Sequence, residues 1–126
     1  MNANGPELNA LSNRIIGCAL TIANALGSGF LEKVYENALA HELRKAGLAE
    51  QQRGITVIYD GIAVGQYFVD LLVEQAILIE LKTVRALDSV HRAQCLNYLR
   101  ATGMHLCLLM NFGTPRLKVR RIVLGL

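Results

Sequence analysis

The sequence lacks long apolar runs, a basic N-terminal cluster and linker-like stretches. No run approaches the roughly 20 consecutive apolar residues that a membrane-spanning helix needs. Met1–Asn9 contain an acidic Glu7 and no basic cluster, unlike a secretory signal. No Ser-, Pro- or Gly-rich stretch is long enough to separate two domains. We therefore expect one domain over residues 1–126, located in the cytoplasm and without a membrane partner.

The residues that build disulfides and zinc sites are also scarce. The three cysteines are odd in number, far apart and embedded in apolar segments, which favours reduced thiols in the core: Cys18, Cys95 and Cys107. The histidines show no spacing that is typical of a metal site. With 52% hydrophobic and 18% charged residues, the composition is too apolar for a disordered chain. The sequence therefore predicts a globular domain without a disulfide framework.

Apolar spacing predicts two helices in the N-terminal part. From about Glu7 to Leu26, apolar residues recur three and four positions apart, on one helix face. Gly27-Ser28-Gly29 ends this helix, and Ser28 is predicted to cap a second helix that Gly47 terminates. The predicted inward stripe of the second helix is Leu31, Val34, Tyr35, Ala38, Leu39 and Leu43.

From Gln52 onward, β-branched and aromatic residues between glycines predict strands. Asp60-Gly61 supplies the positive φ angles of a tight turn, so Ile55–Tyr59 is expected to pair with a strand that begins at Ile62. The remaining predicted elements are strands at Tyr67–Val73, Ile77–Thr83, His105–Asn111 and Leu117–Leu124, and a helix from Asp88 or Ser89 to Gly103. The expected fold is α/β, with the order α-α-β-β-β-α-β-β.

Charged residues interrupt two of these apolar strands. Glu80 and Lys82 stand two apart, so their side chains point to the same face, and Asp70 occupies the matching place on the preceding strand. Two close carboxylates repel each other in a low-dielectric setting, and Mg²⁺ or Mn²⁺ relieves that repulsion. A lysine beside such a cation can orient water or stabilise charge on a phosphate. The alternative is a buried salt bridge of Asp70 or Glu80 with Lys82 that fixes strand register.

The connection between these two strands decides whether the carboxylates meet. Asp70 and Glu80 stand opposite each other only if the connection holds an odd number of residues, such as Glu74-Gln75-Ala76, or if a bulge corrects the register. A regular two-residue turn would oppose Asp70 to Ile79 and split the carboxylates. The metal-site hypothesis therefore requires the longer connection.

Basic residues crowd the C-terminal end. Arg116, Lys118 and Arg120 alternate with Leu117 and Val119, which predicts one basic, exposed strand face. Such a face can track nucleic-acid phosphates, and the net charge of +3 permits an anionic partner without demanding one. The alternative is a charged edge strand that resists aggregation.

Three motifs together resemble a known superfamily. Asp70, nine residues, then Glu80-Leu81-Lys82 resembles the D-x(n)-E-x-K signature of the PD-(D/E)XK nucleases, with Val69 in place of the signature's proline. The segment Gln94 to Tyr98 resembles the Q-h-x-x-Y motif of the RecB-type exonuclease branch, where h is hydrophobic. The segment Gly29 to Tyr35 fits the pattern of the GxxExxY proteins, a family of small bacterial proteins assigned to this superfamily.

The resemblance implies a restriction-endonuclease-like core, with a mixed central β-sheet flanked by helices, and metal-dependent hydrolysis of DNA or RNA. It implies that Asp70, Glu80 and Glu32 hold Mg²⁺ or Mn²⁺, while Lys82 serves the attacking water or the leaving charge. The implied substrate-contacting or site-ordering residues are Gln94, Tyr98, Tyr35 and His91. The alternative is a non-catalytic module that binds nucleic acid or protein and retains the fold. A homo-oligomer, or a partner protein that supplies specificity, is compatible with so small a chain.

Overall fold

The computed structural model describes residues 5–48 and 50–125, except the side chains of residues 51–53. Its helices and strands follow the predicted order α-α-β-β-β-α-β-β. They are α1 (Pro6–Leu26), α2 (Glu32–Lys45), β1 (Glu50–Tyr59), β2 (Ile62–Val73), β3 (Ile77–Lys82), α3 (Ser89–Thr102), β4 (Leu106–Asn111) and β5 (Lys118–Val123). No helix in these ranges is long and apolar enough to cross a membrane.

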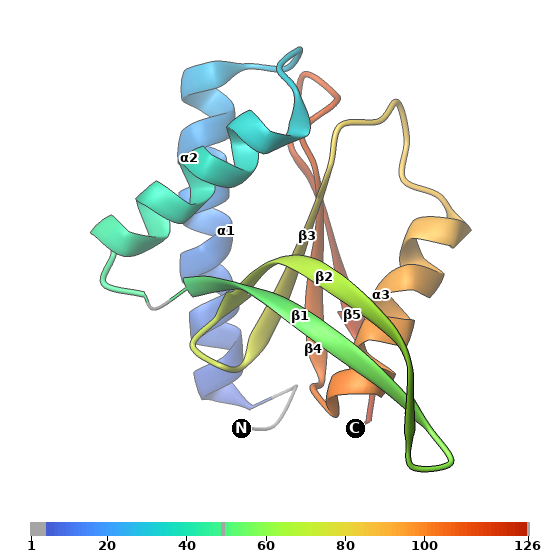
Figure 1. Cartoon of the computed structure of the whole chain (residues 1–126). Coiled ribbons are helices and arrows are strands. Elements are labelled where there is room, and N and C mark those ends of the chain that lie inside the picture. Colours follow the sequence, from blue (N-terminus) through green and yellow to red (C-terminus); the bar gives the residue numbers. More distant parts are fainter. Residues whose placement is uncertain (1–4, 49, 126) are drawn as a thin grey trace.

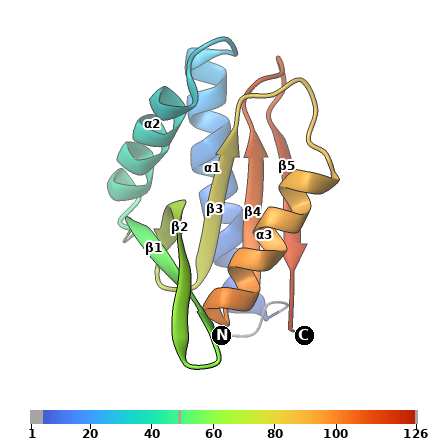
Figure 2. The same cartoon turned by 45° about the vertical axis from the view of Figure 1, so that its right-hand side comes forward.

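The strands form one mixed sheet in the order β1-β2-β3-β4-β5. Neighbouring strands are antiparallel except β3 and β4, which are parallel and are joined through α3. A parallel pair needs such a crossover because the chain must return to the starting edge of the sheet. The helices α1 and α2 cover one face of the sheet, and α3 covers the other (Figures 1 and 2).

Each face of the sheet carries its own apolar core. One core joins α1 and α2 to the sheet through residues such as Ile15, Leu39 and Ile79. The other joins α3 to the sheet through residues such as Leu99 and Leu78. All residues of β4 are buried, as a strand covered by helices on both faces requires. The three cysteines are free, and two of them, Cys95 and Cys107, are fully buried.

The hairpin of β1 and β2 has two long strands where the sequence predicts three shorter ones. Asp60 and Gly61 have φ angles of 52° and 75°, which confirms the predicted tight turn. The strands predicted from Ile62 and over Tyr67–Val73 are one continuous strand, because Gly65 stays in the ladder opposite Val57. The hairpin twists out of the sheet toward α3 (Figure 1).

The start of α2 differs from the prediction. Its N-cap residue is Leu31, without a side-chain cap, so the predicted cap at Ser28 is wrong. Leu31 is 81% exposed and Val34 is also exposed, so the predicted inward stripe holds only from Tyr35 onward. The turn is held instead by the Tyr35 hydroxyl, which donates to the Gly27 carbonyl oxygen (2.6 Å) and accepts from the Phe30 amide (3.2 Å).

A candidate metal site where two strands separate

The three-residue connection between β2 and β3 sets the register that a paired-carboxylate site needs. Val73 pairs with Ile77 and Leu71 pairs with Ile79, so the next positions along the strands are Asp70 and Glu80. The connection is Glu74-Gln75-Ala76, as expected, and its first two residues have φ angles of 52° and 55°. The predicted register is confirmed.

Beyond this point side chains replace the backbone ladder. The Asp70 amide donates to Glu80 Oε1 (3.1 Å), and the Leu81 amide donates to Asp70 Oδ2 (2.7 Å). Each carboxylate therefore binds the backbone of the opposite strand with one oxygen. The side chains of Asp70 and Glu80 thus both lie between β2 and β3, where the backbone ladder has ended.

A β-bulge in β2 lies at the same place as this separation of the two strands. Between the β1–β2 pairs Gln51 with Leu72 and Arg53 with Val69, β2 has two residues, Asp70 and Leu71, where β1 has one. Such a bulge bends a strand and re-aims its side chains. Asp70 therefore sits at an irregular position, which neither its spacing nor its apolar neighbours indicate.

The environment of the two carboxyls favours their protonated form. Glu80 is only 4% exposed, and burial followed by the charge of Asp70 raises its pKa to about 8. Burial also raises the pKa of Asp70 to about 6, and the charges of Glu32 and Glu36 add to this effect. The backbone hydrogen bonds and Lys82 act in the opposite direction without reversing it. Ionising both groups is therefore costly unless a cation joins them.

Lys82 lies beside this pair without bonding to it. Its charge lowers the pKa values of Glu32, Asp70 and Glu80, so it is close to all three. Across the described residues, however, no salt bridge within 4.0 Å joins Lys82 to Asp70 or Glu80. The alternative of a buried ion pair that fixes strand register therefore finds no support in the geometry.

The helix α2 adds acidic groups from the other side. Glu32 is its first residue, and burial raises the pKa of its carboxyl, with Lys82 lowering it and Glu36 raising it. Glu36 is 6% exposed and forms an ion pair with Lys33. Sequence reasoning missed Glu36, although it stands four residues after Glu32 and therefore on the same helix face.

Tyr35 holds the turn in front of α2. It is fully buried, its ring stacks on Phe112 (centroids 4.7 Å apart), and its hydroxyl binds the turn. Gly29 in that turn has a φ angle of 115°, which favours glycine. The G-x-x-E-x-x-Y pattern thus describes a turn, the first residue of α2 and the side chain that fixes both. The proposed ordering role of Tyr35 agrees with this position and stays a prediction.

The helix α3 brings neutral side chains to the pair. Burial, followed by the charge of Glu80, raises the pKa of Tyr98 to about 12, while a hydrogen bond from Gln94 lowers it. Tyr98 is therefore near Glu80, with Gln94 bound to its hydroxyl. Cys95, between them in sequence, is buried and forms a side-chain hydrogen bond with Cys107 of β4.

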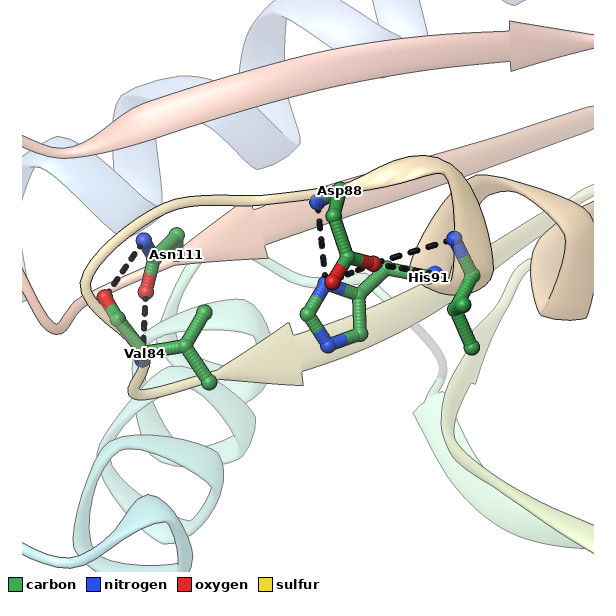
Figure 3. A network of polar contacts seen from close by, with 5 residues as sticks. Val84, Asp88, His91 and Asn111 are labelled. Carbon is green, nitrogen blue, oxygen red and sulfur yellow. Dashed lines mark hydrogen bonds and ion pairs between the residues drawn. The ribbon is translucent and has the colours of Figure 1, made fainter.

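His91 lies in the first turn of α3, three residues before Gln94, and its site-ordering role stays a prediction. Asp88 Oδ1 accepts from the Val90 and His91 amides (3.0 and 3.1 Å), and His91 Nδ1 accepts from the Asp88 amide (3.2 Å), which closes a capping box (Figure 3). The buried Asn111 side chain holds the Val84 amide (3.0 Å) and carbonyl (2.9 Å) of the same loop. These bonds fix the segment that links Lys82 to α3.

The basic residues of the C-terminal strand are only partly brought together. Lys118, Arg120 and Arg116 are exposed, with Leu117 and Val119 half-buried, as the alternation predicts. Arg120 lines two shallow cavities of about 350 and 150 Å³, with Arg92 in the first and with Arg85 and Lys118 in the second. Among the described residues that line them, Arg116 does not occur.

The donor chemistry at the strand separation fits a hard divalent cation. The candidate ligands are the carboxylate oxygens of Asp70, Glu80 and Glu32, which Mg²⁺ and Mn²⁺ prefer. Burial penalises the charged forms of these groups and so raises their pKa values, and a bound cation would offset that penalty. Within residues 5–48 and 50–125, however, no three histidine, cysteine, aspartate or glutamate side chains are already grouped to hold a metal. The two opposed carboxylates are the assembled part of the site.

Comparison with known proteins identifies the superfamily. The solved structure titled "Crystal structure of SSO0001" is 22% identical, with a TM-score of 0.49 over 75% of this chain and 50% of that one, so this chain spans about half its length. No curated protein matches the sequence. A family model described as "PD-(D/E)XK nuclease superfamily" matches residues 9–122, and members of that superfamily are typically metal-dependent. This chain belongs to the PD-(D/E)XK nuclease superfamily.

Proposed function

We propose that this protein is a metal-dependent nuclease that hydrolyses phosphodiester bonds of DNA or RNA. The observation that carries the proposal is the Asp70 and Glu80 pair, which meets where β2 and β3 separate and is held by two strand-to-strand hydrogen bonds. A buried pair of carboxyls with raised pKa values, in a member of a nuclease superfamily, is the expected setting for a divalent cation.

The carboxylates are suited to hold Mg²⁺ or Mn²⁺. Asp70 and Glu80 each use one oxygen for a backbone amide, which leaves the other oxygen for a ligand bond. Glu32, at the first position of α2, would support them directly or through water. When bound, the cation supplies Lewis-acid activation of water and of the phosphate.

The neighbouring groups supply the remaining roles. Lys82, which has no salt bridge to the two carboxylates, would orient the attacking water or stabilise the charge on the leaving oxygen. Gln94 and Tyr98 would order the α3 side of the site, where Gln94 binds the Tyr98 hydroxyl. Arg116, Lys118 and Arg120 would contact phosphates without reading sequence.

Cleavage of labelled DNA and RNA with and without Mg²⁺ or Mn²⁺ tests the proposal. Lys82→Met should lower cleavage by roughly 100-fold or more, the scale of losing a group that handles protons or charge at the reacting centre. Glu7→Gln, which removes an exposed carboxylate from α1, is a control for a change of surface charge outside the site and should cleave like wild type. If wild type binds nucleic acid but cleaves none of the substrates with either metal, the non-catalytic binding module is the better account.

A further inference from the structure

A groove runs between α3 and the β1–β2 hairpin. It has a volume of about 770 Å³, within the range of roughly 300–1,000 Å³ that is typical of small-ligand sites. Residues of the hairpin, including Thr56 and Tyr67, line one side. Residues of α3, including Gln94, Asn97 and Tyr98, line the other.

The groove shares Tyr98 of α3 with the surroundings of the candidate metal site. Gln94 and Tyr98 line the groove, and the charge of Glu80 acts on the same Tyr98 hydroxyl that Gln94 binds. Two side chains of α3, Gln94 and Tyr98, therefore belong to the groove and also lie on the side of the metal site that faces α3. A substrate whose phosphate lies at Asp70 and Glu80 could therefore place its adjoining nucleotide on the Tyr98 side, toward this groove.

The lining combines aromatic faces, amides and one positive charge. Tyr67 lies beside Tyr98 with ring centroids 5.8 Å apart and a tilt of 55°, yet the residue stays 51% exposed. The amides of Gln94 and Asn97 carry both donors and acceptors, and Arg100 donates to Asn97 Oδ1 (3.0 Å). Of the described residues that line the groove, Arg100 carries a charge and none is acidic.

These properties fit an unpaired nucleobase better than a metal ion or a basic peptide. Every base has a π-face that stacks on tyrosine without regard to sequence, and amide groups can bind the base edges that pairing would otherwise occupy. Arg100 attracts phosphate and repels cationic ligands. A stacked base pair inside a duplex cannot enter a groove of this kind without unpairing.

We propose that the groove between α3 and the β1–β2 hairpin binds an unpaired base next to the scissile phosphate, with Tyr67 as its stacking platform. The substrate class is therefore a single strand, or a duplex end or flaw whose nucleotide can leave the stack. The position of the scissile phosphate rests on the proposed nuclease function, whereas the binding of the base does not.

Binding of labelled 12-nucleotide strands in EDTA tests the groove without any cleavage. Wild type should bind oligothymidylate or oligouridylate about tenfold more tightly than a strand of the same length with abasic sites in place of the bases, which is the scale of one base–aromatic stack. The two strands distinguish DNA from RNA as the source of the base. Tyr67→Ala should bind the normal and abasic strands equally, and Tyr67→Phe should behave like wild type.

Two further variants keep the test decisive. Tyr59→Ala removes an aromatic residue that is 73% exposed on the same hairpin but does not line the groove, and it should leave binding unchanged. Ala93→Glu, at an exposed groove position on α3, should weaken binding without removing an aromatic ring, which covers the case that Tyr67→Ala fails to fold.

Several results would overturn the proposal. Equal affinity of wild type for normal and abasic strands would do so, even if the protein cleaves nucleic acid. So would an effect of Tyr59→Ala that equals that of Tyr67→Ala. Dissociation of a dimer by Tyr67→Ala, with unchanged strand binding, would assign the groove to a second copy of the chain. Absence of cleavage, with base-dependent binding intact, would remove only the proposed nuclease function.

Discussion

The two helices that flank the Asp70 and Glu80 pair differ in chemistry. The α2 side brings the buried or half-buried acids Glu32 and Glu36, whose charges act on Asp70. The α3 side brings the neutral Gln94 and Tyr98, and beyond them the aromatic groove. Negative charge gathered on one side suits a cation, whereas stacking and amide surfaces on the other suit an uncharged base. One pair of strands thus lies between two surfaces suited to different parts of one substrate complex.

Removing the Asp70 carboxylate should abolish metal binding and leave base binding in the α3 groove unchanged. Asp70→Asn keeps the shape and removes one charge that must be ionised to hold a cation, so it should abolish cleavage and metal-induced stabilisation. Without metal, the variant should be as stable as wild type or more so, because a repulsive charge is lost. Thermal unfolding with and without Mg²⁺ or Mn²⁺ measures this, since a ligand of the native state raises the melting temperature.

The opposite result would restore the ion-pair account. If wild type is indifferent to metal and Asp70→Asn is destabilised by roughly 3–5 kcal/mol, the carboxylate serves only to balance Lys82. Strand binding in EDTA provides the internal control, because the α3 groove should bind bases equally well in wild type and Asp70→Asn.

The metal-free protein should lose stability as the pH rises. The folded pKa values of Asp70 and Glu80, about 6 and about 8, lie above the roughly 4 of unfolded carboxyls, so the native state holds protons that the unfolded chain releases. This contribution is fully present below about pH 4 and is lost as the pH rises through both folded values, at up to about 1.4 kcal/mol per pH unit and group. Melting temperatures in EDTA from pH 5 to 8 measure the fall.

Two additions to this measurement separate the contribution of Glu80 from that of the cation. Glu80→Gln should flatten the decline between about pH 6 and 8, because the group with the higher pKa is gone. Added Mg²⁺ should stabilise wild type increasingly with pH, because it binds the ionised carboxylates. A metal-free melting temperature that stays level or rises over this range in wild type would contradict the raised pKa values.

Local chemistry predicted those parts of the fold that depend on neighbouring residues. The start of α3 at Asp88 or Ser89, the Asp60-Gly61 turn and the three-residue connection Glu74-Gln75-Ala76 all follow from residues close to each other in sequence. The E-x-K spacing likewise placed Glu80 and Lys82 two apart on one strand. The register that unites Asp70 with Glu80 could therefore be predicted from the length of the connection alone.

Features that depend on distant partners could not be predicted in this way. The bulge at Asp70 and Leu71 exists because β1 pairs with β2 in two different registers on either side of it. The turn before α2 is held by Tyr35, buried against Phe112 from the far end of the chain, rather than by a local cap. The groove requires the hairpin to twist toward α3, which no residue pattern within either element specifies.

The basic strand β5 should have the smallest effect, because it lies at the sheet edge opposite β1 and belongs to neither side of the carboxylate pair. Replacing Lys118 and Arg120 with serine should weaken nucleic-acid binding uniformly across sequences and reduce the magnitude of the salt slope by about 2, one for each lost phosphate contact. Arg116→Ser should change the slope less. Arg120 lines one cavity with Arg92 and another with Arg85, whereas Arg116 does not occur among the described residues that line either cavity. Affinities of a single strand and its duplex, titrated with salt, measure both slopes. Unchanged slopes in the double variant would make β5 a charged edge that only resists aggregation.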